Sequence, residues 1–106
     1  MNKQEIKSIA LSFCSKIKYK LKVIDLNDRS LYGEILIELR GLGLDKKTIG
    51  YIKLDKICTQ LVSKFEECDA FVDFAYSKKP EAEEKFDRYL TPDVVFDIIN
   101  NILNED

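Results

Sequence analysis

The side chains of this chain that could do chemistry are carboxylates, basic groups and three cysteines, because its 106 residues include no histidine. A chain without histidine has no imidazole for acid–base catalysis, no Ser–His or Cys–His nucleophile and no histidine-containing zinc site. Cys14, Cys58 and Cys68 are 44 and 10 residues apart, unlike the ligands of a structural zinc site. We therefore expect no metal, no cofactor and no enzymatic activity.

Two further patterns are also interpreted as structural. Gly41-x-Gly43 lacks the third glycine of a dinucleotide-binding loop and is interpreted as a helix stop. Adjacent carboxylates such as Glu66/Glu67 are predicted to lie on a solvated helix surface and not in a catalytic pair. An enzyme that uses only carboxylates and lysines is the alternative.

The distribution of charge along the chain is its main functional signal. Residues 1–64 contain 13 Lys and Arg against 7 Asp and Glu, a formal charge of +6. Residues 65–106 contain 4 against 12, a formal charge of −8, so the total of −2 conceals an acidic C-terminal part. Charge asymmetry bears on binding partners and not on fold. The charge asymmetry favours a protein that binds a partner with a basic surface.

Length and composition predict a single domain that covers residues 1–106. The N-terminal residues do not have the pattern of a signal peptide, and no stretch approaches the roughly 18 apolar residues of a membrane span. We therefore expect a cytoplasmic protein without a membrane partner. In that reducing compartment the three cysteines are predicted to be free and buried.

The spacing of apolar residues predicts an all-α fold, an antiparallel bundle of four to five helices. Asn2 followed by Glu5 resembles a helix-opening capping pair, and apolar residues from 6 to 24 recur at three- and four-residue steps. Residues 31–41 fit a short helix that stops at Gly41. Alternation within residues 34–54 also fits a small hairpin, which makes an α+β fold the alternative.

Two prolines mark helix boundaries in the C-terminal part. An apolar stripe predicts one long helix from Asp55 to about residue 77, which Pro80 ends. The members of this stripe are Ile57, Leu61, Phe65, Cys68, Val72 and Ala75. Pro80 is also suited to the first position of a further short helix. The sequence Thr91-Pro92-Asp93 has the cap, the proline and the carboxylate typical of the start of a last helix.

The carboxylates of these C-terminal helices are predicted to form one negative surface. On a wheel of the long helix, Asp55, Glu66, Asp69 and Asp73 fall within about 60° of one another. The alternative is a solvated surface neutralised by loose ion pairs, which contribute about 0–1 kcal/mol each. The candidate partner-binding residues are Glu66, Asp69, Asp73, Glu81, Glu83, Glu84 and Asp87.

The lysines of the first helix do not predict a nucleic-acid partner. Lys7, Lys18 and Lys22 are expected near one flank of the helix, and Lys16 and Lys20 on the other. Binding along a phosphate backbone needs a concentrated basic face. We interpret these lysines as solvated residues that border a buried stripe.

The segment LVSKFEECDAF, residues 61–71, resembles a pattern in the colicin D-type bacterial immunity proteins. That pattern is an apolar helix with a phenylalanine, then Asp-Ala-aromatic, an acidic stretch with proline and a closing helix. The resemblance covers about residues 61–103. It implies a small helical bundle without catalytic activity that covers the basic active site of a tRNA-cleaving nuclease toxin.

The same resemblance ranks the candidate residues. Phe65, Asp69 and Phe71 match the pattern, so Asp69 is the leading interface residue, with Glu66 and Asp73 beside it. Helical phase separates Phe74 from the main stripe, and we expect it to pack against the helix after Pro80; the alternative is that Phe74 anchors the partner. The alternative function is a helical regulatory or phage-encoded adaptor that recognises a protein or nucleic acid through its basic first helix.

Overall fold

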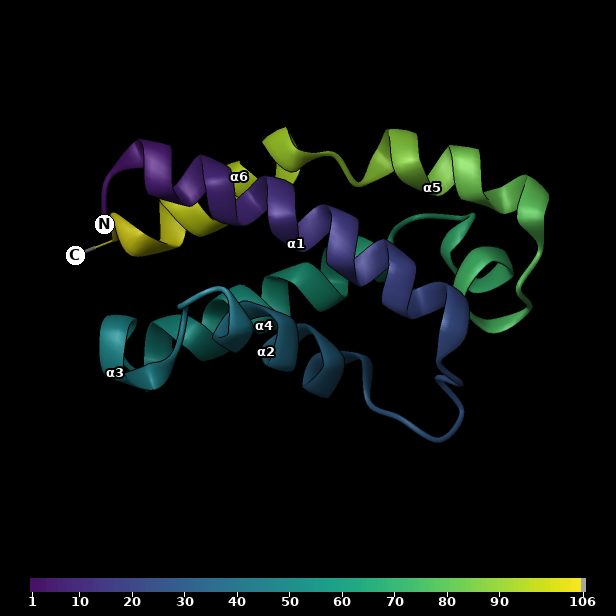
Figure 1. Ribbon diagram of the computed structural model, residues 1–106, viewed down its shortest axis with the longest axis horizontal. Coiled ribbons are helices and arrows are strands. Elements are labelled where there is room, and N and C mark those ends of the chain that lie inside the picture. The colour runs from purple at the N-terminus through teal and green to yellow at the C-terminus, as the bar shows by residue number, and fades with distance from the viewer. Residues whose placement is uncertain (106) are drawn as a thin grey trace.

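The computed structural model describes residues 1–105 and contains only helices and loops in that range. The helix α1 (Lys3–Val23) runs along most of the long axis of the molecule (Figure 1). It packs beside α6 (Pro92–Leu103), which runs in the opposite direction, so the C-terminal end of α6 lies near the N-terminal end of α1 (Figure 1). The side chain of Asn2 caps α1 by accepting a hydrogen bond from Glu5 N at 2.9 Å. The all-α class and the predicted start of the first helix are confirmed.

The middle of the chain is helical, so the alternative of a hairpin within residues 34–54 is wrong. It forms α2 (Leu31–Gly41), α3 (Lys46–Ile49) and α4 (Tyr51–Glu66). Ile35 and Leu39 are fully buried whereas Ile37 between them is 53% exposed, an arrangement that fits helical and not strand periodicity. The predicted stop at Gly41 is confirmed.

Three residues shape the turn from α2 into α4. The carboxylate of Asp45 accepts hydrogen bonds from the backbone N–H groups at the start of α3, and the hydroxyl of Thr48 accepts one from Asp45 N. Gly50 then adopts a φ of +85°, a conformation in which a side chain is strained, and the chain enters α4.

The prediction of one continuous helix from Asp55 to residue 77 is wrong beyond Glu66, where α4 ends. A turn over residues 67–70 leads into a separate π-helix (Val72–Tyr76). This turn changes the helical phase, because Phe71 and Phe74 are buried while Val72, a member of the predicted stripe, is 56% exposed.

The boundaries predicted from the two prolines are confirmed. Pro80 begins the 3-10 helix (Pro80–Ala82), which continues into α5 (Glu83–Tyr89). Thr91 caps α6, its hydroxyl accepting a hydrogen bond from Val94 N at 3.3 Å, and Pro92 is the first residue of that helix. These helix starts follow from local chemistry, because proline has no N–H and the first helical position does not need one.

A cluster of phenylalanine rings holds the C-terminal elements together. The ring centroid of Phe86 on α5 lies 5.0 Å from that of Phe74, 5.6 Å from Phe65 and 5.7 Å from Phe71. All four side chains are buried. Packing of Phe74 against the helix after Pro80 is confirmed.

The three cysteines are buried and form no disulfide, as predicted. Burial raises the pKa of the thiols of both Cys14 and Cys58 to about 11. Among residues 1–105, none of the helices has the length and apolar character needed to cross a membrane.

Candidate functional site

The seven predicted partner-binding carboxylates form two groups in the structure. Because α4 ends at Glu66, the helical wheel that joined Asp55 to Asp69 and Asp73 does not describe the structure. The first group is Glu66 at the end of α4, Asp69 in the turn that follows and Asp73 on the π-helix. The second group, on the 3-10 helix and α5, is Glu81, Glu83, Glu84 and Asp87.

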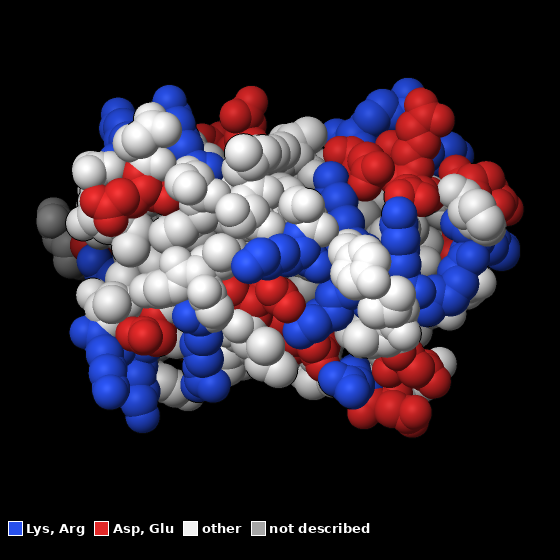
Figure 2. All heavy atoms as spheres, viewed as in Figure 1, with Lys and Arg blue, Asp and Glu red and all other residues white. Residues whose placement is uncertain are grey.

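Three of the four carboxylates of the second group are paired with basic side chains, whereas Glu81 is exposed and has no ion pair among residues 1–105. Lys22 of α1 forms an ion pair with Glu83, and Lys18 Nζ lies 3.4 Å from Asp87 Oδ1. Within α5, Arg88 reaches Glu84 at 3.9 Å. Figure 2 accordingly shows acidic and basic side chains intermixed at the end of the molecule where α5 lies.

Two carboxylates of the first group keep their negative charge uncompensated. Glu66 and Asp69 are exposed, and neither takes part in an ion pair among residues 1–105. Asp73 differs, since Lys79 Nζ lies 3.5 Å from its Oδ1. The turn that ends α4 therefore presents local negative charge to solvent.

A shallow hollow lies beside one of these carboxylates, Glu66. Its volume is about 510 Å³, and it is lined by Leu31, Glu66, Phe71, Val72 and Tyr76. Val72 is 56% exposed and Tyr76 40%, so the hollow is apolar with a carboxylate at its border. An apolar centre with charged residues around it is the usual anatomy of a protein–protein interface.

Sequence analysis did not identify Val72 and Tyr76 as part of this surface. A continuous helix would place Val72 in the buried stripe. The turn after Glu66 instead leaves its side chain exposed. One signal was available. Phe74 is out of phase with that stripe, which indicates a break in the helix before it.

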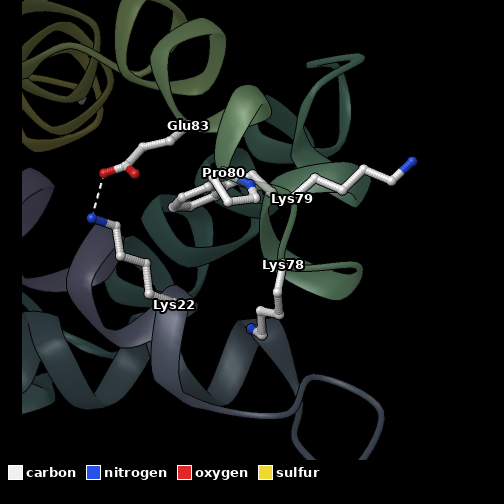
Figure 3. Close-up of a pocket in the computed structure, with 6 residues that line it drawn as sticks. Lys22, Lys78, Lys79, Pro80 and Glu83 are labelled. Carbon is white, nitrogen blue, oxygen red and sulfur yellow. Dashed lines mark ion pairs between the residues drawn. The ribbon is translucent and has the colours of Figure 1, made fainter.

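A second, smaller pocket of about 160 Å³ contains three lysines and is shown in Figure 3. Lys22 pairs there with Glu83, and Lys79 points away from the pocket (Figure 3). The ammonium group of Lys78 donates hydrogen bonds to the carbonyl oxygens of Leu21, Ile24 (2.7 Å) and Ala75 (2.5 Å). All three cations are thus engaged within the protein, and the pocket offers no free charge to an anion.

A buried charge network joins α1 to α2. Glu34 is 4% exposed, and its Oε2 lies 2.9 Å from Lys20 Nζ, while Arg29 Nη1 lies 3.2 Å from its Oε1. Lys20 also contacts Glu38 at 2.9 Å. The Lys20 ammonium, aided by the Arg29 guanidinium, holds the pKa of the Glu34 carboxyl below its ordinary value although burial opposes this effect.

Glu34→Gln is expected to lower the free energy of unfolding by about 1.5 kcal/mol at pH 7. A carboxylate with a depressed pKa stabilises the fold above its unfolded pKa of about 4.3, and this contribution is lost as the pH falls through the folded value. Urea unfolding at pH 7 and pH 3 measures this effect. The difference in free energy of unfolding between the native protein and the Glu34→Gln variant should be smaller at pH 3. Glu66→Gln, at an exposed and unpaired position, is the control and should change little at either pH. An equal deficit of the Glu34 variant at both pH values would contradict the prediction.

Among residues 1–105, no group of three or more potential metal ligands is close enough to hold an ion. Comparison with known protein families, curated protein sequences and solved structures finds no match to this chain.

Proposed function

We propose that this protein is an immunity protein that neutralises a nuclease toxin by covering its basic active site. The observation that carries the proposal is the pair Glu66 and Asp69, both exposed and free of ion pairs among residues 1–105, with Glu66 lining the hollow at Val72 and Tyr76. A tRNA-cleaving domain binds phosphates and therefore has a basic groove, which these carboxylates would meet in place of RNA.

Charge, apolar contact area and sequence resemblance each support this function. Opposite charges steer two proteins together and raise the rate of association, which matters for an inhibitor that must capture a toxin before it cleaves RNA. The apolar side chains of Val72 and Tyr76 would supply the desolvated centre that charge alone does not provide. The resemblance of residues 61–103 to colicin D-type immunity proteins points to the same function.

The ion pairs within the protein limit which carboxylates are available to a partner. Glu83 and Asp87 are held by lysines of α1, so their negative charge contributes less to a long-range field than the −8 of residues 65–106 suggests. Engagement of Lys18, Lys20 and Lys22 by carboxylates likewise weakens the alternative of an adaptor that binds nucleic acid through α1. We therefore place the leading contact at the end of α4.

Co-expression with tRNA-cleaving toxin domains tests the function directly. The protein should restore growth of a strain that makes its cognate toxin domain and should co-purify with that domain. The double variant Glu66→Lys with Asp69→Lys is expected to weaken the complex at least about tenfold and to lose protection, because it places two cations against a basic groove. Binding is measured by calorimetry at two salt concentrations, since the contact should weaken as salt rises.

A matched control makes the same change of charge elsewhere. Asp28→Lys with Asp97→Lys also replaces two exposed carboxylates that have no ion pair among residues 1–105, and it should keep full protection. Equal loss of binding by both double variants would contradict the proposed surface. Failure of every toxin domain to bind or to be neutralised would contradict the function itself.

A further inference from the structure

The hollow at Glu66, Val72 and Tyr76 has charge of only one sign in its wall. Its lining contains one carboxylate, that of Glu66, and no lysine or arginine among residues 1–105. Four further hollows on the same molecule each have at least one lysine in the wall. A concave surface with negative charge and no positive charge attracts cations. This hollow is therefore suited to a positively charged occupant.

The position of Glu66 in its helix adds to the negative charge at the hollow. Glu66 is the last residue of α4, where backbone carbonyl groups give the helix end a partial negative charge. The nearest basic residue in the sequence, Lys64, does not pair with Glu66. Its ammonium group lies 3.9 Å from the carboxylate of Glu67 and 5.3 Å from the ring centroid of Tyr89. A carboxylate at this end of a helix is unfavourable for the fold, and a cation from outside would remove the conflict.

The rest of the wall is apolar and includes an aromatic ring in a fixed orientation. Tyr76 is 40% exposed, and its ring centroid lies 6.0 Å from that of Phe71 with the two ring planes at 89°. Because Phe71 is buried, this edge-to-face contact holds the Tyr76 ring in place. Leu31 and Val72 complete the wall. The hollow thus combines a carboxylate, an oriented aromatic ring and aliphatic side chains.

The backbone that carries two of these side chains is also unusual. Val72 and Tyr76 are the first and last residues of the π-helix, and Ser77 N donates a hydrogen bond to Val72 O, five residues back, at 3.1 Å. Lys78, two residues after the π-helix, has a φ of +56°. Both π-helices and backbone conformations of this kind are concentrated at functional sites. The backbone therefore supports a binding role for this hollow.

We infer that this hollow binds one arginine side chain of the partner, with the guanidinium group paired to Glu66 and stacked on Tyr76. This binding mode rests on the proposed function, in which the partner has a basic surface. A guanidinium group is planar and weakly hydrated, forms two parallel hydrogen bonds with a carboxylate and stacks on aromatic rings. The methylene groups of arginine cover apolar residues such as Val72. The ammonium group of lysine is strongly hydrated and not planar, so it fits this wall less well.

Titration of the protein alone with blocked single amino acids tests this binding mode. Nα-acetyl-arginine amide, added at constant ionic strength, should shift the amide NMR signals of Glu66, Val72 and Tyr76 saturably, with a dissociation constant on the order of 10 mM. Citrulline in the same blocked form has the same shape without the charge and should bind at least about fivefold more weakly. Blocked lysine should bind at least about threefold more weakly. The signals of Tyr51 and Ile52, which are exposed but outside the hollow, should not move.

Variants of the wall identify the groups that bind arginine. Glu66→Gln should weaken the binding of blocked arginine at least about fivefold, because it removes the charge from the hydrogen-bond acceptor. Its melting temperature should not fall, since the native carboxylate opposes the helix dipole. Tyr76→Leu keeps an apolar side chain without the ring and should weaken binding at least about twofold. The matched control is Glu81→Gln, which changes an exposed residue outside the hollow with no ion pair among residues 1–105 and should leave arginine binding unchanged.

Three results would overturn the arginine site. They are equal binding of blocked arginine and citrulline, lysine binding as tight as that of arginine, and equal effects of Glu66→Gln and Glu81→Gln. The titration contains no toxin, so its failure differs from a failure of the proposed function. A toxin neutralised by a protein that does not bind arginine at this hollow would reject the arginine site alone. Arginine binding without neutralisation of any toxin domain would reject the proposed function alone.

Discussion

Phe86→Ala is expected to lower the free energy of unfolding by about 4 kcal/mol, the largest effect of any single substitution considered. Phe86 is fully buried, and its ring contacts those of Phe65, Phe71 and Phe74 within 5.7 Å between centroids. Phe65 belongs to α4, Phe71 directly precedes the π-helix and Phe74 lies within it, so truncation leaves a cavity shared by several elements. A domain of this size has a total stability of only about 5–15 kcal/mol, of which this loss is a large part.

Urea unfolding followed by circular dichroism measures this loss. The midpoint should fall while the slope of free energy against urea stays the same, which shows that stability and not compactness has changed. Val72→Ala, also an apolar truncation but at a 56% exposed position, should cost less than about 0.5 kcal/mol. Similar midpoints for the two variants would refute the role of the phenylalanine cluster.

Lys78→Met should lower the free energy of unfolding by about 2 kcal/mol. The ammonium group of Lys78 donates to carbonyl oxygens at the C-terminal end of α1 and in the π-helix, and it thereby joins the two elements. Methionine keeps the length of the side chain but has no donor, so these carbonyl groups lose their partner. Both residues bear the same backbone cost at the φ of +56° found at this position.

The neighbouring Lys79 is the matched control for this substitution. Lys79→Met removes the same charge from an exposed side chain whose one ion pair, with Asp73, is 3.5 Å long. It should cost less than about 0.5 kcal/mol. Thermal melts of the two variants compare the effects, and equal melting temperatures would show that the hydrogen bonds of Lys78 contribute nothing specific.

The helix ends that were predictable from sequence are those set by local chemistry. Asn2 and Thr91 accept hydrogen bonds from backbone groups three residues ahead, and Pro80 and Pro92 start helices because of their own covalent geometry. The end of α4 has a different origin. Its position depends on Phe71 and Phe74 reaching Phe86, residues that the folded chain alone brings together.

The candidate site was predictable only in part for the same reason. The acidic character of the C-terminal part is visible in composition, and Glu66 and Asp69 do lie exposed at the end of α4. Which carboxylates stay unpaired was not visible, because Lys18 and Asp87 are 69 residues apart and meet only through the packing of α1 near α5. The apolar side of the hollow, formed by Val72 and Tyr76, was not predictable because their exposure depends on the break in the helix after Glu66.

The rates at which the buried cysteines are alkylated report how often different parts of the native protein unfold. Alkylating reagents react with the thiolate, and the pKa of about 11 at Cys14 and Cys58 suppresses this form while the thiols stay covered. Cys68 lies in the turn between α4 and the π-helix, so its alkylation rate follows the release of that turn. The rates at Cys14 and Cys58 follow separation of the central helices. Mass spectrometry of modified peptides thus distinguishes local release near the proposed toxin contact from unfolding of the whole molecule.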